Sequence, residues 1–301
     1  MLRPGWLLLG AALALSSFLG RAVRWQVMML PAHSSFWNIV FATYVGFSAA
    51  VIFGRTGELV RPYLIARREH TALAAQAGIW TLERFYDFSV ILLLFGIGLT
   101  RARQLGAGWP LQFFLQISSW MALGCVLLAG AIFYLLVRKP AFSRERLSDA
   151  TSFLPKEHHA RLMRSLDSFL NAVRPAGRWP VLVASVALTA AEWAMIFGAV
   201  WSYFHAFPPA SSFSILDIAA YFGFTAFGAI LQLPGIGGGL QVASIVILTE
   251  LFRMSVEQAT GFSLLVWAGT SMIVLLSGIP LALYGGLSLG KVRSMGREAR
   301  L

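Results

Sequence analysis

Three groups of charged residues in this chain have the types and spacing to do chemistry among apolar segments. In the first, Arg55, Gly57 and Glu58 follow an apolar stretch, and Arg61 and Pro62 come shortly after. Glu58 and Arg61 are three residues apart and can pair on one helical face. Gly57 permits a tight turn, and Pro62 suits the first turn of a new helix. Two arginines beside the free amides of a helix start would bind a phosphate group. The alternative is a turn with ordinary surface charges.

The second group is Glu83, Arg84 and Asp87 at the head of an apolar segment. Glu83 and Asp87 share a face at i and i+4, where two carboxylates repel unless a cation lies between them. Arg84 can pair with Asp87, and Glu83 then needs Arg55, Arg61 or a proton. The group is either part of a binding site or a structural network of ion pairs.

The third group is the single residue Glu192, near the middle of an apolar segment without another charge. A charged side chain at mid-bilayer costs about 2.5–3.5 kcal/mol on insertion scales, so a retained one needs a partner, water or a function. Glu192 therefore carries a proton or faces a polar cavity. The alternative is a neutral acid hydrogen-bonded to a neighbouring helix.

Other chemistry has no motif in the chain. The five histidines are scattered over different segments and loops, without the spacing of metal ligands. The glycine run at 235–239 lacks the Lys and Ser/Thr that follow in a nucleotide-binding loop. We therefore expect no metal, no cofactor and no enzymatic activity.

The elements that position these groups are apolar helices. The chain of 301 residues is 57% hydrophobic and 12% charged, whereas an ordinary soluble domain has about 25% charged residues. A net charge of +11 on such a chain does not indicate a nucleic-acid binder, because the apolar runs leave little room for a soluble scaffold. The candidate membrane segments are 6–19, 36–53, 80–99, 115–137, 180–204, 215–233, 242–252 and 262–283. This pattern predicts one all-α integral membrane domain over 1–301, a polytopic bundle of about six to eight segments.

One of these segments is interrupted. Residues 242–252 are too short to span comfortably alone, and they follow Pro234, Gly235 and Gly237, which a regular helix does not tolerate well. Bare backbone at membrane depth survives only if it is buried in protein or lines a water-filled cavity. The sequence predicts a re-entrant or broken helix here, of the kind that marks a transport site.

Basic residues set the expected orientation. Nine of them lie between two apolar segments: Arg138, Lys139, Arg144, Arg146, Lys156, Arg161, Arg164, Arg174 and Arg178. The tail at 284–301 is also basic, whereas residues 205–214 contain no Lys or Arg. The positive-inside rule therefore places the loop at 138–179 and the C-terminus in the cytoplasm.

Three features of this topology have alternatives. Residues 6–19, which end at Arg21 and Arg24, favour a retained helix over a signal peptide. Residues 36–53 either cross the membrane or form a re-entrant segment from the cytoplasm, and the re-entrant arrangement satisfies the charge rule better. Within the basic loop, Leu162, Leu166 and Leu170 have amphipathic helical spacing. That helix lies on the membrane surface or is a connector packed on the bundle.

Taken together, the motifs around Arg55, Arg61, Glu83 and Pro234 resemble the flippase-like membrane domain of lysylphosphatidylglycerol synthases. The resemblance runs from about Arg21 to Leu283. It implies a bundle with two re-entrant elements that moves a phospholipid or a lipid-linked headgroup between leaflets of a bacterial-type inner membrane. The matching positions imply a polar path formed by Arg55, Glu58, Arg61, Glu83, Arg84 and Asp87.

The chain departs from the family pattern in two places. Phe53 stands where the family often has Pro, and Gln241 stands where it tends to have Glu. Gln241 cannot carry a proton, so the sequence does not support proton coupling at that point. The 18 residues after Leu283 are too few for the soluble aminoacyl-transfer domain of the bifunctional synthases. We expect that a separately encoded lipid-modifying enzyme or a second copy is a partner. The alternative functions are a headgroup-modifying enzyme and a non-transporting accessory of envelope biogenesis.

Overall fold

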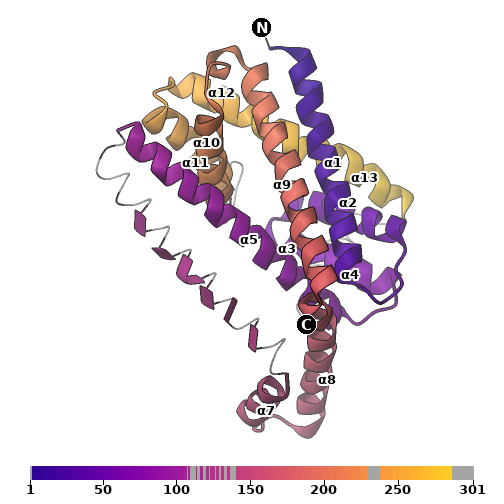
Figure 1. Cartoon of the computed structure of the whole chain (residues 1–301). Coiled ribbons are helices and arrows are strands. Elements are labelled where there is room, and N and C mark those ends of the chain that lie inside the picture. Colours follow the sequence, from indigo (N-terminus) through magenta and orange to yellow (C-terminus); the bar gives the residue numbers. More distant parts are fainter. Residues whose placement is uncertain are drawn as a thin grey trace. The chain divides into compact units, whose positions relative to one another are not determined.

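The apolar stretches of the sequence form helices in the computed structural model (Figure 1). The structure describes residues 2–106, 108, 140–229 and 238–286, the side chains of 55 and 140–143 excepted, and the positions 113, 116, 117, 120, 121, 123–125, 127, 128, 130, 131, 134 and 135. No strand occurs in this part of the chain, so the predicted all-α class is confirmed. Of the 23 residues in the predicted segment 115–137, the structure describes 13, and these are helical; the others lie outside the described residues.

Five helical stretches in the described chain are long and apolar enough to cross a membrane. They are α1 (Pro4–Met28), α2 (Phe36–Phe53), α5 (Leu73–Gln104), α9 (Trp179–Ala206) and the stretch Val256–Tyr284, which joins α12 (Val256–Trp267), η4 (Ala268–Met272) and α13 (Ile273–Tyr284). The protein is therefore a multi-pass membrane protein. The boundary predicted for the first helix was wrong: α1 continues to Met28, so that Arg21 and Arg24 lie inside the helix and do not flank it.

A helical hairpin follows α1. It is built from α2, the short α3 (Arg55–Glu58) and α4 (Val60–Arg68), with α4 packed back along α2. The backbone N–H of Ser35 donates to Glu69 at 3.0 Å, so the two ends of the hairpin lie side by side. The chain therefore folds back on itself within the hairpin.

Glycines allow the close packing of this hairpin. A Cβ atom on Gly46 would lie 2.5 Å from Cβ and 2.9 Å from Cα of Arg61, and one on Gly57 would clash with the carbonyl of Ala49. The turn itself is made by Gly54, whose φ of +62° favours glycine. Gly57, predicted to permit a tight turn, lies in the short α3 that connects α2 to α4, and its missing side chain allows the contact with α2. Pro62 lies in the first turn of α4, as predicted.

A second hairpin is formed by α10 (Ile215–Gly228), α11 (Gly238–Val246) and the π-helical turn η3 (Ile247–Leu251). Tyr221 and Ser244 share a hydrogen bond of 2.8 Å across it. The predicted span 215–233 was wrong, because α10 has 14 residues and ends at Gly228. The predicted break at Pro234, Gly235 and Gly237 lies outside the described residues.

The basic loop contains two helices, α7 (Pro140–Ala150) and α8 (Lys156–Val173), followed by the 3-10 turn η1 (Arg174–Gly177). Arg144 and Asp167 pair across them at 3.0 Å. Met163, Leu170 and Val173 of α8 are buried. A Cβ atom on Gly78 of α5 would lie 3.1 Å from Val173 Cγ1, so this face of α8 packs against α5. Of the two interpretations of the amphipathic helix, the packing supports the connector.

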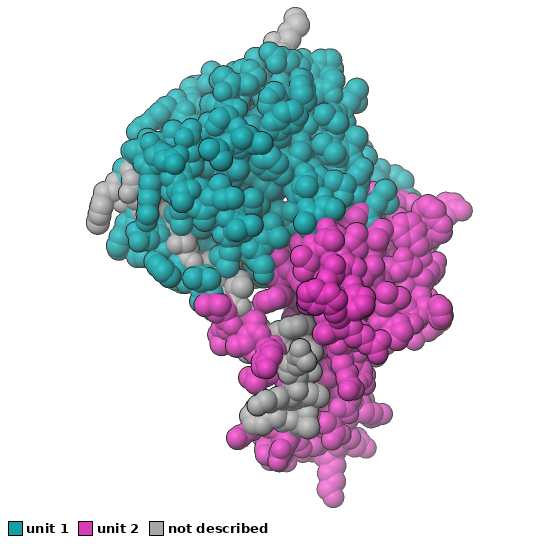
Figure 2. Space-filling model, viewed as in Figure 1, with its two compact units in different colours: residues 1–19, 88–124, 190–280 teal, residues 20–87, 125–189, 281–301 magenta. Residues whose placement is uncertain are grey.

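The chain divides into two compact units, which are coloured separately in Figure 2. Unit 1 contains residues 1–19, 88–124 and 190–280, and unit 2 contains residues 20–87, 125–189 and 281–301. The core of unit 1 is aromatic: Phe204 of α9 packs against Tyr221 of α10 and Phe262 of α12, with ring centroids 5.0 and 4.4 Å apart. The interior of unit 2 is different, because charged side chains lie within it.

Candidate functional site

Arg24 is the centre of a buried group of charges in unit 2. Its side chain is 0% exposed. Nη2 donates to Glu83 Oε1 at 2.9 Å, and Nη1 donates to Asp87 Oδ1 and to the hydroxyl of Thr189, both at 2.9 Å. Arg24 is thus the cation that lies between the two carboxylates on one face of α5. The spacing of Glu83 and Asp87 predicted that a cation lies between them, but it did not identify Arg24 as that cation.

Arg61 approaches the same carboxylates from the α2–α4 hairpin. Its Nη1 donates to both oxygens of Glu83, at 3.0 and 2.9 Å, and its Nη2 donates to the backbone carbonyl of Arg21 at 3.1 Å. The guanidinium lies over the ring of Trp25, 4.2 Å from the centroid. Of the partners that the sequence left open for Glu83, which were Arg55, Arg61 or a proton, the structure shows Arg61. The hairpin is therefore joined to α1 and α5 through one buried side chain.

Two further arginines complete the group. Arg84 pairs with Asp87 at 3.2 Å, as predicted, and lies 3.5 Å from Glu83. Arg21 pairs with Asp87 at 3.5 Å. Their side chains are 30% and 11% exposed, so these two lie at the accessible side of the group. We call Arg21, Arg24, Arg61, Glu83, Arg84 and Asp87 the arginine–carboxylate cluster.

Positive charge exceeds negative charge in and around the cluster. Glu58 of α3 interacts electrostatically with Arg84. Counting it, four arginines face three carboxylates among the side chains that the structure describes. The Nε atoms of Arg61 and Arg84 are also buried donors without a hydrogen-bond acceptor among the described residues. A guanidinium offers five N–H donors and no acceptor, so the unused capacity of the cluster suits an anion.

The other predicted site residues are distributed between the units. Gly57 lies at the contact of α3 with α2, and Arg55 begins α3, with its side chain outside the described part. Glu192 is fully buried in α9 and belongs to unit 1, as does the half-buried Gln241 of α11. The structure therefore brings Arg61, Glu83, Arg84 and Asp87 together, with Glu58 beside Arg84.

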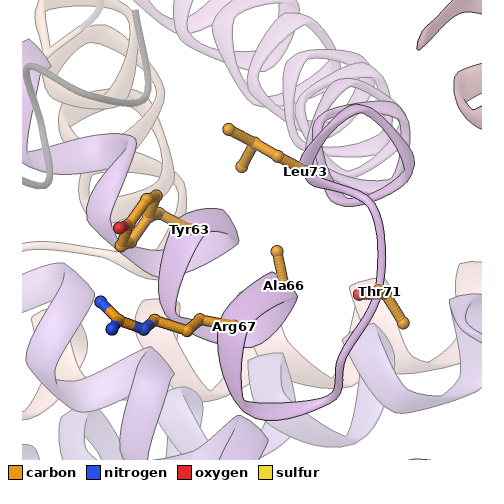
Figure 3. Close-up of a pocket in the computed structure, with 5 residues that line it drawn as sticks. All are labelled: Tyr63, Ala66, Arg67, Thr71 and Leu73. Carbon is orange, nitrogen blue, oxygen red and sulfur yellow. The ribbon is translucent and has the colours of Figure 1, made fainter.

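A chain of polar contacts leads from the cluster to a surface pocket. Trp25 donates from Nε1 to Gln76 Oε1, and Gln76 donates from Nε2 to the Thr71 hydroxyl, both at 2.9 Å. Thr71 lines a pocket of about 320 Å³ together with Tyr63, Ala66, Arg67 and Leu73 (Figure 3). In Figure 3 the side chains of Tyr63 and Arg67 extend from α4 in the same direction. Sequence analysis missed Trp25, Gln76 and Thr189 along with Arg24, because no local motif marks them.

The arrangement is suited to holding an anionic group. Buried arginines with surplus donors bind phosphate oxygens through charge-assisted hydrogen bonds, which are about twice as strong as neutral ones. Among the described residues, no group of three or more His, Cys, Asp or Glu side chains is placed to hold a metal.

The chain was compared with protein families, curated proteins and solved structures. Residues 1–278 match the family model described as Lysylphosphatidylglycerol synthase TM region. No curated protein and no solved structure matches the chain.

Proposed function

The chain belongs to the Lysylphosphatidylglycerol synthase TM region family, and on that premise we propose that it is a lipid translocator. It moves a phospholipid or a lipid-linked headgroup between the leaflets of a bacterial-type inner membrane. The observation that carries this proposal is the arginine–carboxylate cluster, in which arginines predominate inside a membrane-embedded unit. Ionised side chains within membrane segments are costly and mark substrate pathways.

In this function the arginines receive the phosphate of the headgroup while the acyl chains stay in lipid. Arg84 and Arg21 are the accessible members and make the first contact. Arg24 and the two carboxylates hold the arginines in place. Each guanidinium is already paired in part with a carboxylate of the protein. An arginine can therefore exchange its carboxylate for a phosphate oxygen of the headgroup, and later return to the carboxylate. Reversible exchange of this kind lowers the desolvation cost of carrying a charged headgroup across an apolar layer.

The α2–α4 hairpin forms part of the proposed path. Discontinuous helices with short arms surround substrate sites in many transporters. The hairpin has this form, and it contributes Arg61 to the cluster. The basic loop and the C-terminus lie in the cytoplasm, where a separately encoded lipid-modifying enzyme is a suitable partner.

The test is transbilayer exchange of a fluorescent phospholipid in proteoliposomes. Arg84→Gln removes one accessible guanidinium, and we expect exchange to slow roughly tenfold, which corresponds to the loss of one charged hydrogen bond. Arg164→Gln is the matched control, since it removes the same charge from the exposed face of α8. Arg55→Ala tests the motif residue predicted from sequence.

Two results would contradict the proposal. One is unchanged exchange in Arg84→Gln and Arg55→Ala vesicles. The other is covalent change of the lipid, which would favour a headgroup-modifying enzyme, because a translocator leaves the covalent structure of its lipid intact.

A further inference from the structure

The pocket shown in Figure 3 is a second candidate site, apart from the arginine–carboxylate cluster. We propose that it binds a small organic anion from the cytoplasm, and that occupation of the pocket is transmitted to Arg61 of the cluster. The ligand is not the transported lipid, so the inference goes beyond the proposed function. Two observations support it: the lining of the pocket and the hydrogen bonds behind that lining.

The lining combines one cation with an apolar wall. Arg67 is exposed and forms no ion pair in the part of the chain that the structure describes, and none of the five lining residues is acidic. The adjacent Arg68 differs, because its guanidinium stacks on Phe41. Ala66 and Leu73 supply the apolar wall, and the pocket of about 320 Å³ has the size of a small-molecule site. An anionic group beside Arg67, with a short apolar body, matches this lining.

The hydroxyl of Thr71 offers a second contact. In Figure 3, Ala66 lies between Thr71 and the side chain of Arg67. Thr71 Oγ1 accepts from Gln76 Nε2 at 2.9 Å, and the hydroxyl hydrogen has no acceptor among the described residues. A hydroxyl can donate one hydrogen bond while it accepts another. The ligand that suits both contacts therefore carries an anionic group and a second oxygen, separated by an apolar chain.

The pocket lies on the side of the membrane that the basic loop occupies. Leu73 begins α5, and Gly78 in the second turn of this helix packs against Val173 of α8 in the basic loop. The charge rule predicts that this loop is cytoplasmic. A soluble ligand would therefore reach the pocket from the cytoplasm.

Hydrogen bonds connect the Thr71 hydroxyl to Arg61. Gln76 is 1% exposed, and its amide donates to Thr71 and accepts from Trp25 Nε1, both at 2.9 Å. Trp25 is fully buried, and the guanidinium of Arg61 lies over its ring, 4.2 Å from the centroid. Hydrogen bonds in a chain polarise one another, so a ligand that accepts from Thr71 strengthens the bonds of Gln76. The contact of Trp25 with Arg61 changes with them, and such coupling between two sites is reciprocal.

Glutarate is the probe, because it has a carboxylate at each end of a short methylene chain. The full chain in a neutral detergent is titrated with glutarate in a calorimeter. We expect saturable binding of glutarate and none of the diamine cadaverine, a chain of similar length with the opposite charge. Arg67→Gln should weaken glutarate binding about tenfold, because it removes one charge-assisted hydrogen bond. Thr71→Val, which keeps the shape of the side chain, should weaken it severalfold.

Two control variants separate the pocket from other arginines. Arg164→Gln removes the same charge from the exposed face of α8 and should leave the affinity for glutarate unchanged. Arg84→Gln, in the cluster, should change this affinity far less than Arg67→Gln does. Absence of saturable glutarate binding, or equal losses in Arg84→Gln and Arg67→Gln, would overturn the inference.

An anionic lipid headgroup is the other source of this chemistry. Phosphatidylglycerol is therefore added to the Arg84→Gln protein in the presence of glutarate. We expect no displacement of glutarate, because the ligand is soluble. Displacement would assign the pocket to a lipid headgroup and overturn the assignment to a soluble anion.

Tryptophan emission tests the connection to Arg61. Glutarate should shift the emission of the native chain, because the hydrogen bond of the Trp25 indole becomes stronger. Trp25→Phe should remove the shift while glutarate still binds. A shift of the same size in Trp25→Phe, or none in the native chain, would contradict the transmission to the cluster.

Both measurements are independent of transport. Loss of lipid exchange in proteoliposomes, with glutarate binding intact, would contradict only the proposed function. Loss of glutarate binding, with exchange intact, would contradict only the second site.

Discussion

At the scale of single residues, Arg24 decides how the charges in unit 2 are arranged. Glu83 and Asp87 lie on one face of α5 and would repel each other without a cation between them. Arg24 donates to both at 2.9 Å, and Thr189 accepts the remaining hydrogen bond of Nη1. Arg61 and Arg84 then each reinforce one of the carboxylates. The cluster is therefore organised around a side chain whose neighbours in sequence give no hint of its role.

Arg24→Ala is expected to destabilise the protein by about 3–5 kcal/mol, because it leaves the buried carboxylates short of a counter-ion. The free energy of unfolding in mixed micelles is the measurement. Arg24→Gln combined with Asp87→Asn should recover part of the loss, because it removes charge of both signs and keeps hydrogen-bonding groups. Equal stability of Arg24→Ala and the native chain would contradict the central role of Arg24.

At the scale of elements, the α2–α4 hairpin places Arg61 by bringing two backbones very close together. Gly46 of α2 lies against the backbone of Arg61, and the hairpin is closed at its open end by Asn38, which donates to Glu69 at 2.7 Å. Arg68 stacks on Phe41 in the same region, 3.6 Å from the ring centroid. The position of Arg61 is thus set by packing along the whole length of α4.

Gly46→Ala is expected to cost about 1–3 kcal/mol, because the added methyl overpacks the contact with Arg61. Lipid exchange should fall as Arg61 is displaced from Glu83. Gly96→Ala is the matched control, since a Cβ atom there meets nothing within 4 Å and alanine is the better helix former. Thermal unfolding and exchange are measured on both variants. Equal behaviour of the two would show that hairpin packing does not position Arg61.

At the scale of the whole molecule, each of the two units contains a helical hairpin. In unit 2 the hairpin is α2–α4, and in unit 1 it is α10–α11, in which the backbone of Gly228 comes close to Ala243. The interiors differ, because unit 1 has an aromatic core and unit 2 has the arginine–carboxylate cluster. Under the proposed function, the headgroup therefore binds in unit 2, where the arginine–carboxylate cluster lies.

The orientation of the molecule in the membrane is testable by labelling single cysteines. In a Cys125→Ser background, Phe153→Cys places a thiol in the exposed turn between α7 and α8, where Phe153 is 81% exposed. Ser212→Cys places one in the turn between α9 and α10. The charge rule predicts that an impermeant maleimide labels Ser212→Cys in intact cells and Phe153→Cys only after permeabilisation. The reverse pattern would contradict the cytoplasmic assignment of the basic loop.

Much of this protein could be predicted from its sequence, because the relevant properties are local. Hydropathy and length identified the helices α2, α5, α9 and Val256–Tyr284, since a membrane segment needs only a sufficient apolar run. The spacing of Glu83, Arg84 and Asp87 identified one face of α5. The extent of α1 was less predictable, because the buried partners of Arg24 allow the helix to continue through two arginines.

The tertiary structure alone decided which charges on different helices meet. Arg24 lies 59 residues from Glu83 and 165 residues from Thr189, and no pattern in the sequence connects positions so far apart. Ion pairs and hydrogen bonds depend on distances of about 3 Å, which are fixed only when helices pack against one another. The different roles of Gly54 and Gly57 are also visible only in the structure. Gly54 has the positive φ angle of the turn, and Gly57 lies where two backbones come close together, and both are properties of the folded chain.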